Sequence, residues 1–170
     1  LDDSIGESFV KVATILGIEW SASGPGPSVE EWASRGNPDR EKFTVPFSAK
    51  GEKGNFSFSG LKSAVARLAQ QKLNTNGGPE RDTIVADIAA SFQKTAVTHI
   101  IQRLQDALRS TSGINQLVVS GGVANNKYLR HRYANLLLRI LELCQKHNTA
   151  VFFPSPHLCT DNAAMIAWTA

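Results

Sequence analysis

Apolar residues recur at helical spacing near the start of the chain. Between residues 5 and 18 they fall three or four positions apart, which predicts a helix that Gly17 ends. The segment 21–27 holds two prolines and two glycines, which favour turns and interrupt the helical pattern. A second helix is predicted to begin at Ser28 and to carry Glu30 in its first turn, where a carboxylate favours the positive end of the helix dipole.

The middle of the chain changes from a helical pattern to an alternating one and back. Apolar and polar residues alternate at 43–47 and 56–58, around a turn rich in lysine, glycine and glutamate. This alternation predicts a β-hairpin or two short strands. A helix is then predicted over 59–72, and a longer one over 83–110, where apolar residues are spaced mostly four apart.

The last third of the chain has the pattern of an α/β protein. The predicted elements are a short buried strand at 116–120, a glycine pair, a helix at 128–146, a strand at 150–153 and a closing helix at 161–169. The sequence therefore predicts an α/β fold in two parts. Residues 1–110 form a helical and hairpin part, and residues 111–170 form the part that carries the candidate nucleotide and metal site.

Composition and charge narrow the class of protein. A chain of 170 residues, 42% apolar and 19% charged, is typical of soluble globular proteins, and no run of 18 apolar residues is present. We therefore expect no membrane partner. Two cysteines are too few for a disulfide framework. A net charge of +3 suits an anionic partner, and basic residues gather within 127–139, on a helix face that is either solvated or RNA-binding.

The glycine pair Gly121-Gly122 follows the first predicted strand of the α/β part. In open α/β sheets, ligands bind beyond the carboxyl ends of strands, and glycines let an adenine or a phosphate lie against the backbone. Asn126, at the start of the next predicted helix, offers an amide to a ribose or a phosphate. The alternative is a tight turn between strand and helix, with Asn126 as its cap.

Asp161 precedes the small residues of the closing helix. Its carboxylate either caps that helix or binds a metal ion at the ligand edge of the sheet. The four histidines never recur at the spacing that places two imidazoles on one helix face, so any further metal ligands lie elsewhere.

Two earlier segments leave similar alternatives open. The Gly24–Pro27 run either presents Glu30 to ribose hydroxyls from a rigid turn or simply connects two helices. Ser59-Gly60 either cradles an anion at a helix start or only caps the helix.

Five motifs, in order along nearly the whole chain, carry a resemblance to a known family. They are DDSIGESF at 2–9, FSFSGLK at 56–62, DIAASFQ at 87–93, GGVANN at 121–126 and LCTDNAAMIA at 158–167. Together they resemble the TsaD/OSGEP family of tRNA threonylcarbamoyltransferases, in its bacterial and mitochondrial branch. The resemblance implies an actin-like (Hsp70-like, sugar-kinase-like) ATPase fold, of which this chain is the C-terminal portion.

The resemblance also implies a reaction: threonylcarbamoyl passes from its adenylate to the adenosine beside the anticodon of tRNAs that read ANN codons. It implies one divalent metal ion, iron or zinc, and a nucleotide, threonylcarbamoyl-adenylate or ATP. The implied partners are tRNA, a separate synthase that supplies the adenylate, and a second copy of the chain. The location is mitochondrial, or alternatively the bacterial cytoplasm. The residues that match the family's positions are Gly26, Glu30 and Asn126 for the substrate or nucleotide and Asp161 for the metal. Gly121 and Gly122 join the candidate nucleotide site through their place after the predicted strand.

Two departures from the family pattern bear on activity. Val10 stands where the family has an aspartate, so that side chain cannot accept a hydrogen bond from a ribose. The family's first half, with its His-x-x-x-His pair, has no counterpart here, so we expect this chain alone to be inactive. One rival hypothesis is a non-catalytic paralogue or truncated module that binds a nucleotide or a partner. Another is a sugar kinase of the same fold, which leaves Cys159-Thr160-Asp161-Asn162 unexplained.

Overall fold

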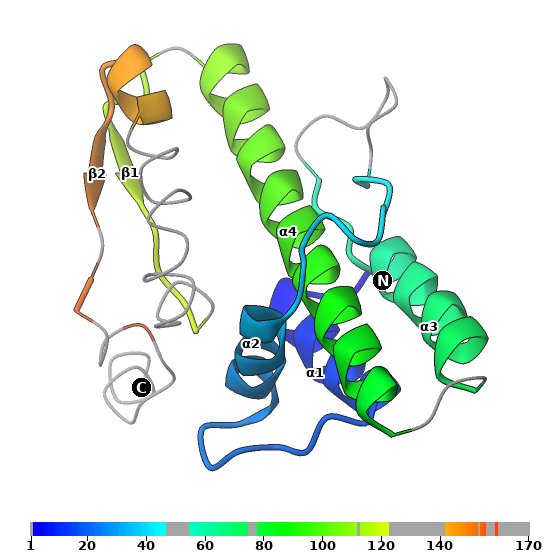
Figure 1. The fold of residues 1–170 in the computed structure, drawn as a ribbon. Coiled ribbons are helices and arrows are strands. Elements are labelled where there is room, and N and C mark those ends of the chain that lie inside the picture. The colour runs from blue at the N-terminus through cyan, green and yellow to red at the C-terminus, as the bar shows by residue number, and fades with distance from the viewer. Residues whose placement is uncertain are drawn as a thin grey trace. The chain divides into compact units, whose positions relative to one another are not determined.

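The computed structural model of the chain describes residues 2–46, 55–74, 78–111, 113–122, 142–152, 154, 155 and 159 (Figure 1). The chain divides into two compact units, Leu1–Ala107 and Leu108–Ala170, and each is described by itself. The first unit is helical. Its elements are α1 (Ile5–Leu16), α2 (Pro25–Arg35), α3 (Ser59–Leu73) and the greater part of the long helix α4 (Pro79–Ser110).

Helix α1 begins and ends as its sequence predicts. The Ser4 hydroxyl accepts a hydrogen bond from the backbone N–H of Glu7 at 3.2 Å, and the serine and glutamate have the spacing of a capping box. Gly17 ends the helix with φ of 67°, a left-handed conformation that glycine adopts without steric strain. The backbone N–H of Ile18 then bonds back to the carbonyl of Ala13 at 2.9 Å.

Helix α2 starts three residues earlier than the sequence predicts, at Pro25 instead of Ser28. The prolines do not delay the helix because the first N–H groups of any helix lack intrahelical partners, so a proline there loses no hydrogen bond. The early start moves Glu30 out of the first turn and into the second, so the predicted contact of Glu30 with the helix terminus was wrong.

The predicted β-hairpin is also wrong in the residues that can be described. Residues 42–46 and 55–58 form no strand, and Phe47 lies outside the described residues. The alternation at 56–58 instead reflects packing against α4, where Phe58 lies edge-to-face with the His99 ring at 5.4 Å. The backbone N–H of Ser57 donates to Nε2 of His99 at 3.2 Å, and burial followed by the nearby Arg103 charge lowers the pKa of this imidazole.

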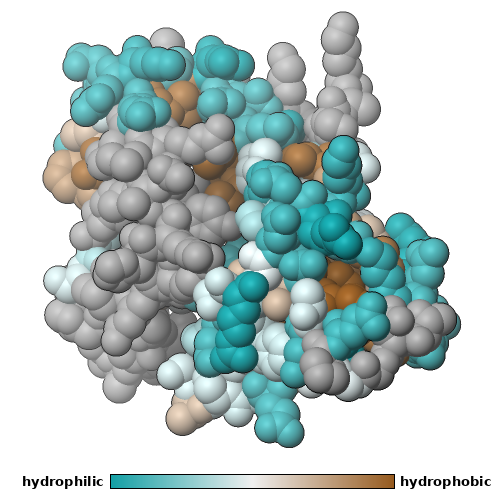
Figure 2. All heavy atoms as spheres, in the orientation of Figure 1, coloured by the Kyte–Doolittle hydropathy of each residue, from teal (hydrophilic) through white to brown (hydrophobic). Residues whose placement is uncertain are grey.

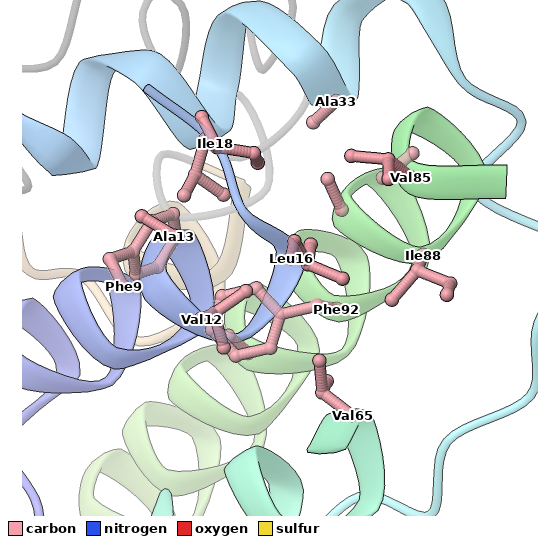
Figure 3. Packing of buried hydrophobic residues seen from close by; sticks show 14 of the residues in the cluster. Phe9, Val12, Ala13, Leu16, Ile18, Ala33, Val65, Val85, Ile88 and Phe92 are labelled. Carbon is pink, nitrogen blue, oxygen red and sulfur yellow. The ribbon is translucent and has the colours of Figure 1, made fainter. Parts of the chain in front are cut away.

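A single hydrophobic core holds the first unit together (Figure 3). All four helices contribute buried side chains to it. The Phe9 ring of α1 and the Phe92 ring of α4 meet edge-to-face, with centroids 5.0 Å apart. Ala33 of α2 and Val65 of α3 belong to the same cluster. The buried residues of α4 thus pack against side chains from the other three helices.

The segment after α2 lies directly against α4. A Cβ added to Gly36 would come within 2.0 Å of the carbonyl oxygen of Ala86, so the two backbones approach more closely than any side chain allows. The Asp87 carboxylate accepts from the backbone N–H of Asn37 at 2.7 Å, and the Ser91 hydroxyl accepts from Glu41 at 3.2 Å. Part of the DIAASFQ motif therefore fixes a connecting segment.

The second unit contains a two-stranded parallel sheet formed by β1 (Gln116–Val118) and β2 (Ala150–Phe152). Residues 142–146 are helical, and the rest of the predicted 128–146 helix and the predicted 161–169 helix lie outside the described residues. The sequence predicted a buried first strand, but Val118 is 61% exposed and its register partner Phe152 is 50% exposed. The burial of a strand depends on what packs on the faces of its sheet, which apolar composition alone does not reveal.

No helix in the described part of the chain is long and apolar enough to cross a membrane. On the face drawn in Figure 2, hydrophilic residues cover most of the described surface and hydrophobic ones show only in small patches. The sequence likewise contains no run of 18 apolar residues.

Candidate functional site

The predicted substrate residues of the first unit, Gly26 and Glu30, both lie on α2. The turn that leads into this helix is fixed by the Ser28 hydroxyl, which donates to the carbonyl of Gly24 at 3.0 Å and accepts from the N–H of Ser21 at 2.8 Å. Gly24 has φ of 95°, which a residue with a side chain rarely adopts. The Gly24–Pro27 run is thus a firmly held entry to α2, which fits both the rigid-turn and the connecting alternatives.

Glu30 is buried, with 2% of its surface exposed. Burial raises the pKa of its carboxyl from 4.5 to about 8, because the charged form loses its hydration. At neutral pH this group is therefore mostly the neutral acid, which both donates and accepts hydrogen bonds. Buried carboxyl groups with raised pKa values gather at functional sites, although structural burial also produces them.

The backbone N–H groups at the start of α3 bind the carboxylate of another residue of the chain. The backbone N–H groups of Phe58 and Ser59 both donate to Oδ1 of Asp2 at 3.0 Å, and Phe58 itself supplies no side-chain cap. Burial alone would raise the pKa of Asp2, but hydrogen bonds from Ser57, Ser59 and Phe58 outweigh it and hold this pKa well below its ordinary value. The sequence left two roles open for Ser59-Gly60, an anion cradle and a helix cap. In the structure this segment begins a helix that a carboxylate distant in sequence caps.

A neighbouring carboxylate links two helices. Asp3 pairs with Lys11 of α1 and Lys62 of α3, each at 2.6 Å. Hydrogen bonds from these two lysines lower the pKa of Asp3. Three of the five motifs therefore meet in the first unit: residues 2–9 contact residues 56–62 through Asp2 and Asp3, and residues 87–93 through the phenylalanine pair.

Val10, the departure from the family pattern, lies on α1 and is half-buried. Its carbonyl accepts from the Thr14 hydroxyl at 3.2 Å, an interaction within the helix. The apolar side chain offers no hydrogen-bonding atom at this position. The loss of one ribose contact at Val10 stays a prediction.

The glycine pair of the second unit follows β1. Gly121 has φ of 108°, so its backbone conformation favours glycine, and a Cβ at Gly121 or Gly122 would meet no atom within 4 Å. The backbone there is accessible to a ligand. Ser120, directly before the pair, donates from its hydroxyl to the Cys159 sulfur at 3.9 Å, and the Cys159 thiol donates to the carbonyl of Pro154 at 3.6 Å.

Asn126 and Asp161 lie outside the described residues, so their proposed contacts stay predictions. Among the residues that are described, no three His, Cys, Asp or Glu side chains lie close enough together to hold a metal ion. The structure places Gly26 with Glu30 on α2, and Gly121 with Gly122 after β1. These two pairs belong to different units, each described by itself.

Sequence reasoning missed the capping role of Asp2 and the thiol of Cys159. The bond from Ser59 to Asp2 joins residues 57 positions apart, and the one from Ser120 to Cys159 joins residues 39 apart. No local spacing indicates either contact. The only available signal was their membership of two motifs that resemble the family.

Comparison with known proteins agrees with the motifs. The family model described as "TsaD: tRNA N6-adenosine threonylcarbamoyltransferase" matches residues 1–168. A tRNA N6-adenosine threonylcarbamoyltransferase of Gluconobacter oxydans is 40% identical over 175 residues, which cover 100% of this chain and 44% of that protein. The enzyme of that name from Novosphingobium aromaticivorans is 43% identical over 169 residues, covering 99% of this chain and 43% of its own length.

A plant protein described as "Probable tRNA N6-adenosine threonylcarbamoyltransferase, mitochondrial", from Arabidopsis thaliana, is 40% identical over 179 residues, covering 99% of this chain and 35% of its own length. The chain thus spans less than half the length of these relatives. A match over nearly all of the chain shows the family, and the resemblance predicted from the five motifs is confirmed. The chain belongs to the TsaD family.

Proposed function

We propose that the polypeptide containing this chain is a tRNA N6-adenosine threonylcarbamoyltransferase. It transfers threonylcarbamoyl from threonylcarbamoyl-adenylate to the adenosine beside the anticodon of tRNAs that read ANN codons. The names of the relatives support the reaction. The structural observation that carries the proposal is the Gly121-Gly122 turn, which follows a strand of a parallel sheet and has open space beside its backbone.

The proposal includes the fold of the whole molecule. We infer that the complete polypeptide has an actin-like ATPase fold and that this chain is its C-terminal portion. The parallel pair β1 and β2 and the helices around residues 79–110 and 142–146 are compatible with an α/β protein of that kind. The lengths of the relatives leave room for a further domain of similar size.

Of the proposed nucleotide contacts, Gly26, Glu30 and Asn126 are assigned residue by residue from the resemblance. Gly121 and Gly122 are assigned from their place after a strand. For Gly121 and Gly122 the support is an open backbone whose N–H and C=O groups can approach a ligand. For Glu30, which is 2% exposed, the assignment rests on the resemblance alone.

The chemistry is an acyl transfer. The N6 amino group of adenosine forms a bond to the carbonyl carbon of threonylcarbamoyl, the bond from that carbon to the phosphate oxygen breaks, and AMP leaves while the amine loses a proton. Adenosine N6 is a weak nucleophile, so holding it against the acyl group in the right orientation supplies much of the acceleration. Residues that fix the adenylate, such as those of the glycine turn, carry this part of the catalysis.

We infer one divalent metal ion, iron or zinc, with Asp161 as this chain's ligand. Such an ion supplies electrostatic stabilisation of charge that develops on the acyl phosphate. The proposed partners are tRNA, the synthase that makes the adenylate, and a second copy of the chain. Relatives exist both in bacteria and, for the Arabidopsis protein, in mitochondria. We propose a mitochondrial location, with the bacterial cytoplasm as the alternative.

A second candidate function rests on Val10. Its apolar side chain on α1 removes a hydrogen-bonding group that the family pattern supplies, which favours a non-catalytic module that retains nucleotide or partner binding. A module of this kind would bind ATP but would modify no tRNA.

The two candidates are separated by one assay on the complete polypeptide. Purified protein is incubated with threonylcarbamoyl-adenylate and an unmodified tRNA that reads an ANN codon, and the modified nucleoside is measured by mass spectrometry. The enzyme proposal predicts product from the wild type and none from Asp161→Ala, with both proteins folded. ATP binding without product from the wild type would establish the non-catalytic module instead.

A further inference from the structure

We propose that Cys159 is a positioning residue that holds the Gly121-Gly122 turn in its ligand-binding conformation. The inference deepens the proposed function and rests on it, because it assumes that this turn contacts the nucleotide. Cys159 would touch no substrate atom itself. Its role is to fix the residue directly before the turn.

The regular pairing of the sheet stops just short of the turn. Val118 is in register with Phe152, and the backbone N–H of Val119 donates to the carbonyl of Phe152 at 2.9 Å. No further backbone bond joins the described residues that follow, and Gly121 then turns the chain with φ of 108°. Lateral support from another part of the chain favours binding at such a turn, because a flexible loop loses affinity through the entropy of ordering it.

The Cys159 thiol supplies that support. Its sulfur accepts from the Ser120 hydroxyl at 3.9 Å and its S–H donates to the carbonyl of Pro154 at 3.6 Å. Ser120 follows β1, and Pro154 follows β2, so a single side chain bridges the two segments at the carboxyl ends of both strands. Sulfur forms weak hydrogen bonds, but one thiol can accept and donate at once.

Burial distinguishes this arrangement from a chance contact at the surface. Cys159 is 4% exposed, whereas Ser120 is exposed. The buried thiol thus holds the hydroxyl of an exposed residue that directly precedes the turn. Site residues that are held by buried partners bind more tightly than those on loops without such partners.

The chain offers a matched control in its other cysteine. Cys144 is 1% exposed and also free, and it lies in the same unit. Its backbone carbonyl accepts from Thr149, and no described hydrogen bond links its side chain to the glycine turn. Cys144→Ala and Cys159→Ala each remove one buried thiol, so they are expected to lose similar amounts of stability through lost packing.

The experiment uses the complete polypeptide carrying Cys159→Ala, Cys159→Ser, Ser120→Ala or Cys144→Ala. KM and kcat for threonylcarbamoyl-adenylate and Kd for ATP are measured at a temperature where all variants are folded. Loss of two weak hydrogen bonds predicts that Cys159→Ala raises KM and Kd about fivefold with kcat nearly unchanged. Cys159→Ser, which keeps a donor and an acceptor, is expected to recover part of this loss, and Cys144→Ala to match the wild type.

The exposed position of Ser120 keeps the test decisive even if Cys159→Ala fails to fold. Ser120→Ala removes the same hydrogen bond from its other end and is expected to raise KM and Kd in the same direction. Equal KM and Kd for the Cys159, Ser120 and Cys144 variants would overturn the proposal and make Cys159 a packing residue only. A wild type that binds ATP but transfers nothing would instead refute the proposed function, while the Kd values would still decide the role of Cys159.

Discussion

The carboxylate of Asp2 accepts a hydrogen bond from the backbone N–H of Ser59 at 3.0 Å, and a second at the same distance from Phe58. Two motifs that are far apart in the sequence therefore meet at the first turn of α3. The helix begins without a cap of its own, and the start of the chain provides one. In this contact the two motifs act structurally, because the carboxylate of the first caps the helix that carries the second.

Asp2→Ala is expected to reduce the free energy of unfolding by about 1 kcal/mol, the usual effect of removing a helix cap. Asp2→Asn should lose less, because its amide oxygen still accepts. Since the folded pKa of Asp2 lies below its unfolded value of 3.8, the contribution is present above about pH 4 and disappears as the pH falls through the folded pKa. Urea unfolding at pH 7 measures the effect.

The control for this prediction is Asp39→Ala. Asp39 pairs with Lys94 on the surface, and its side chain is 73% exposed, so little change is expected. An Asp2→Ala variant as stable as Asp39→Ala would show that the contact with α3 does not support the helix.

Gly36→Ala is expected to destabilise the first unit by about 1–3 kcal/mol, because the added methyl group overlaps the backbone of α4. The nearest atom, the carbonyl oxygen of Ala86, cannot move aside without distorting the helix. Gly60→Ala is the matched control, since a Cβ there meets nothing within 4 Å and the residue lies inside α3. Thermal unfolding of both variants checks the prediction, and equal melting temperatures would contradict the close approach.

Glu30→Gln is expected to change how stability depends on pH. The folded pKa of about 8 exceeds the unfolded value of 4.5, so the folded state binds the proton more tightly and wild-type stability falls as the pH rises from 4.5 to 8. The amide has no proton to lose. The variant should therefore be more stable than the wild type at pH 8.5, by on the order of a few kcal/mol, and differ little at pH 5.

Glu31→Gln provides the comparison for Glu30. Glu31 is the next residue on α2, and its side chain is 62% exposed and paired with Arg35, so its replacement should alter stability little at either pH. Urea unfolding of both variants at pH 5 and pH 8.5 completes the test. Parallel pH profiles for wild type and Glu30→Gln would show that the carboxyl of Glu30 is hydrated.

Local patterns predicted the helices of the first unit and the strands of the second, because capping residues, glycines and apolar spacing act over a few residues. Ser4 and Gly17 mark the ends of α1 for this reason. The predicted hairpin failed because the apolar positions of 56–58 are explained by contacts with His99, some 40 residues away. Similarly, no local pattern indicated that the backbone at Gly36 lies against Ala86, 50 residues further along the chain.

The candidate site was predictable to a different extent in its two units. Gly121 has a positive φ, which fits both the ligand-binding turn and the tight turn that the sequence left open. No sequence pattern indicated that the carboxyl of Glu30 is buried. Periodicity places a residue on a helix, but how deeply it is buried depends on which other elements pack there. The roles of Asn126 and Asp161 stay predictions from the resemblance.

The most direct test of the proposed site is threonylcarbamoyl transfer to tRNA by the complete polypeptide carrying Gly121→Ala or Gly113→Ala. Both glycines have positive φ, 108° and 81°, so both substitutions strain the backbone of the second unit. Gly113 lies before β1 and Gly121 after it, at the end of the strand where ligands bind. We expect Gly121→Ala to lower kcat/KM for the adenylate at least about tenfold relative to Gly113→Ala, because a Cβ and a changed φ would displace the ligand from the backbone. Equal kcat/KM values for the two variants, at equal stability, would contradict a nucleotide site at this turn.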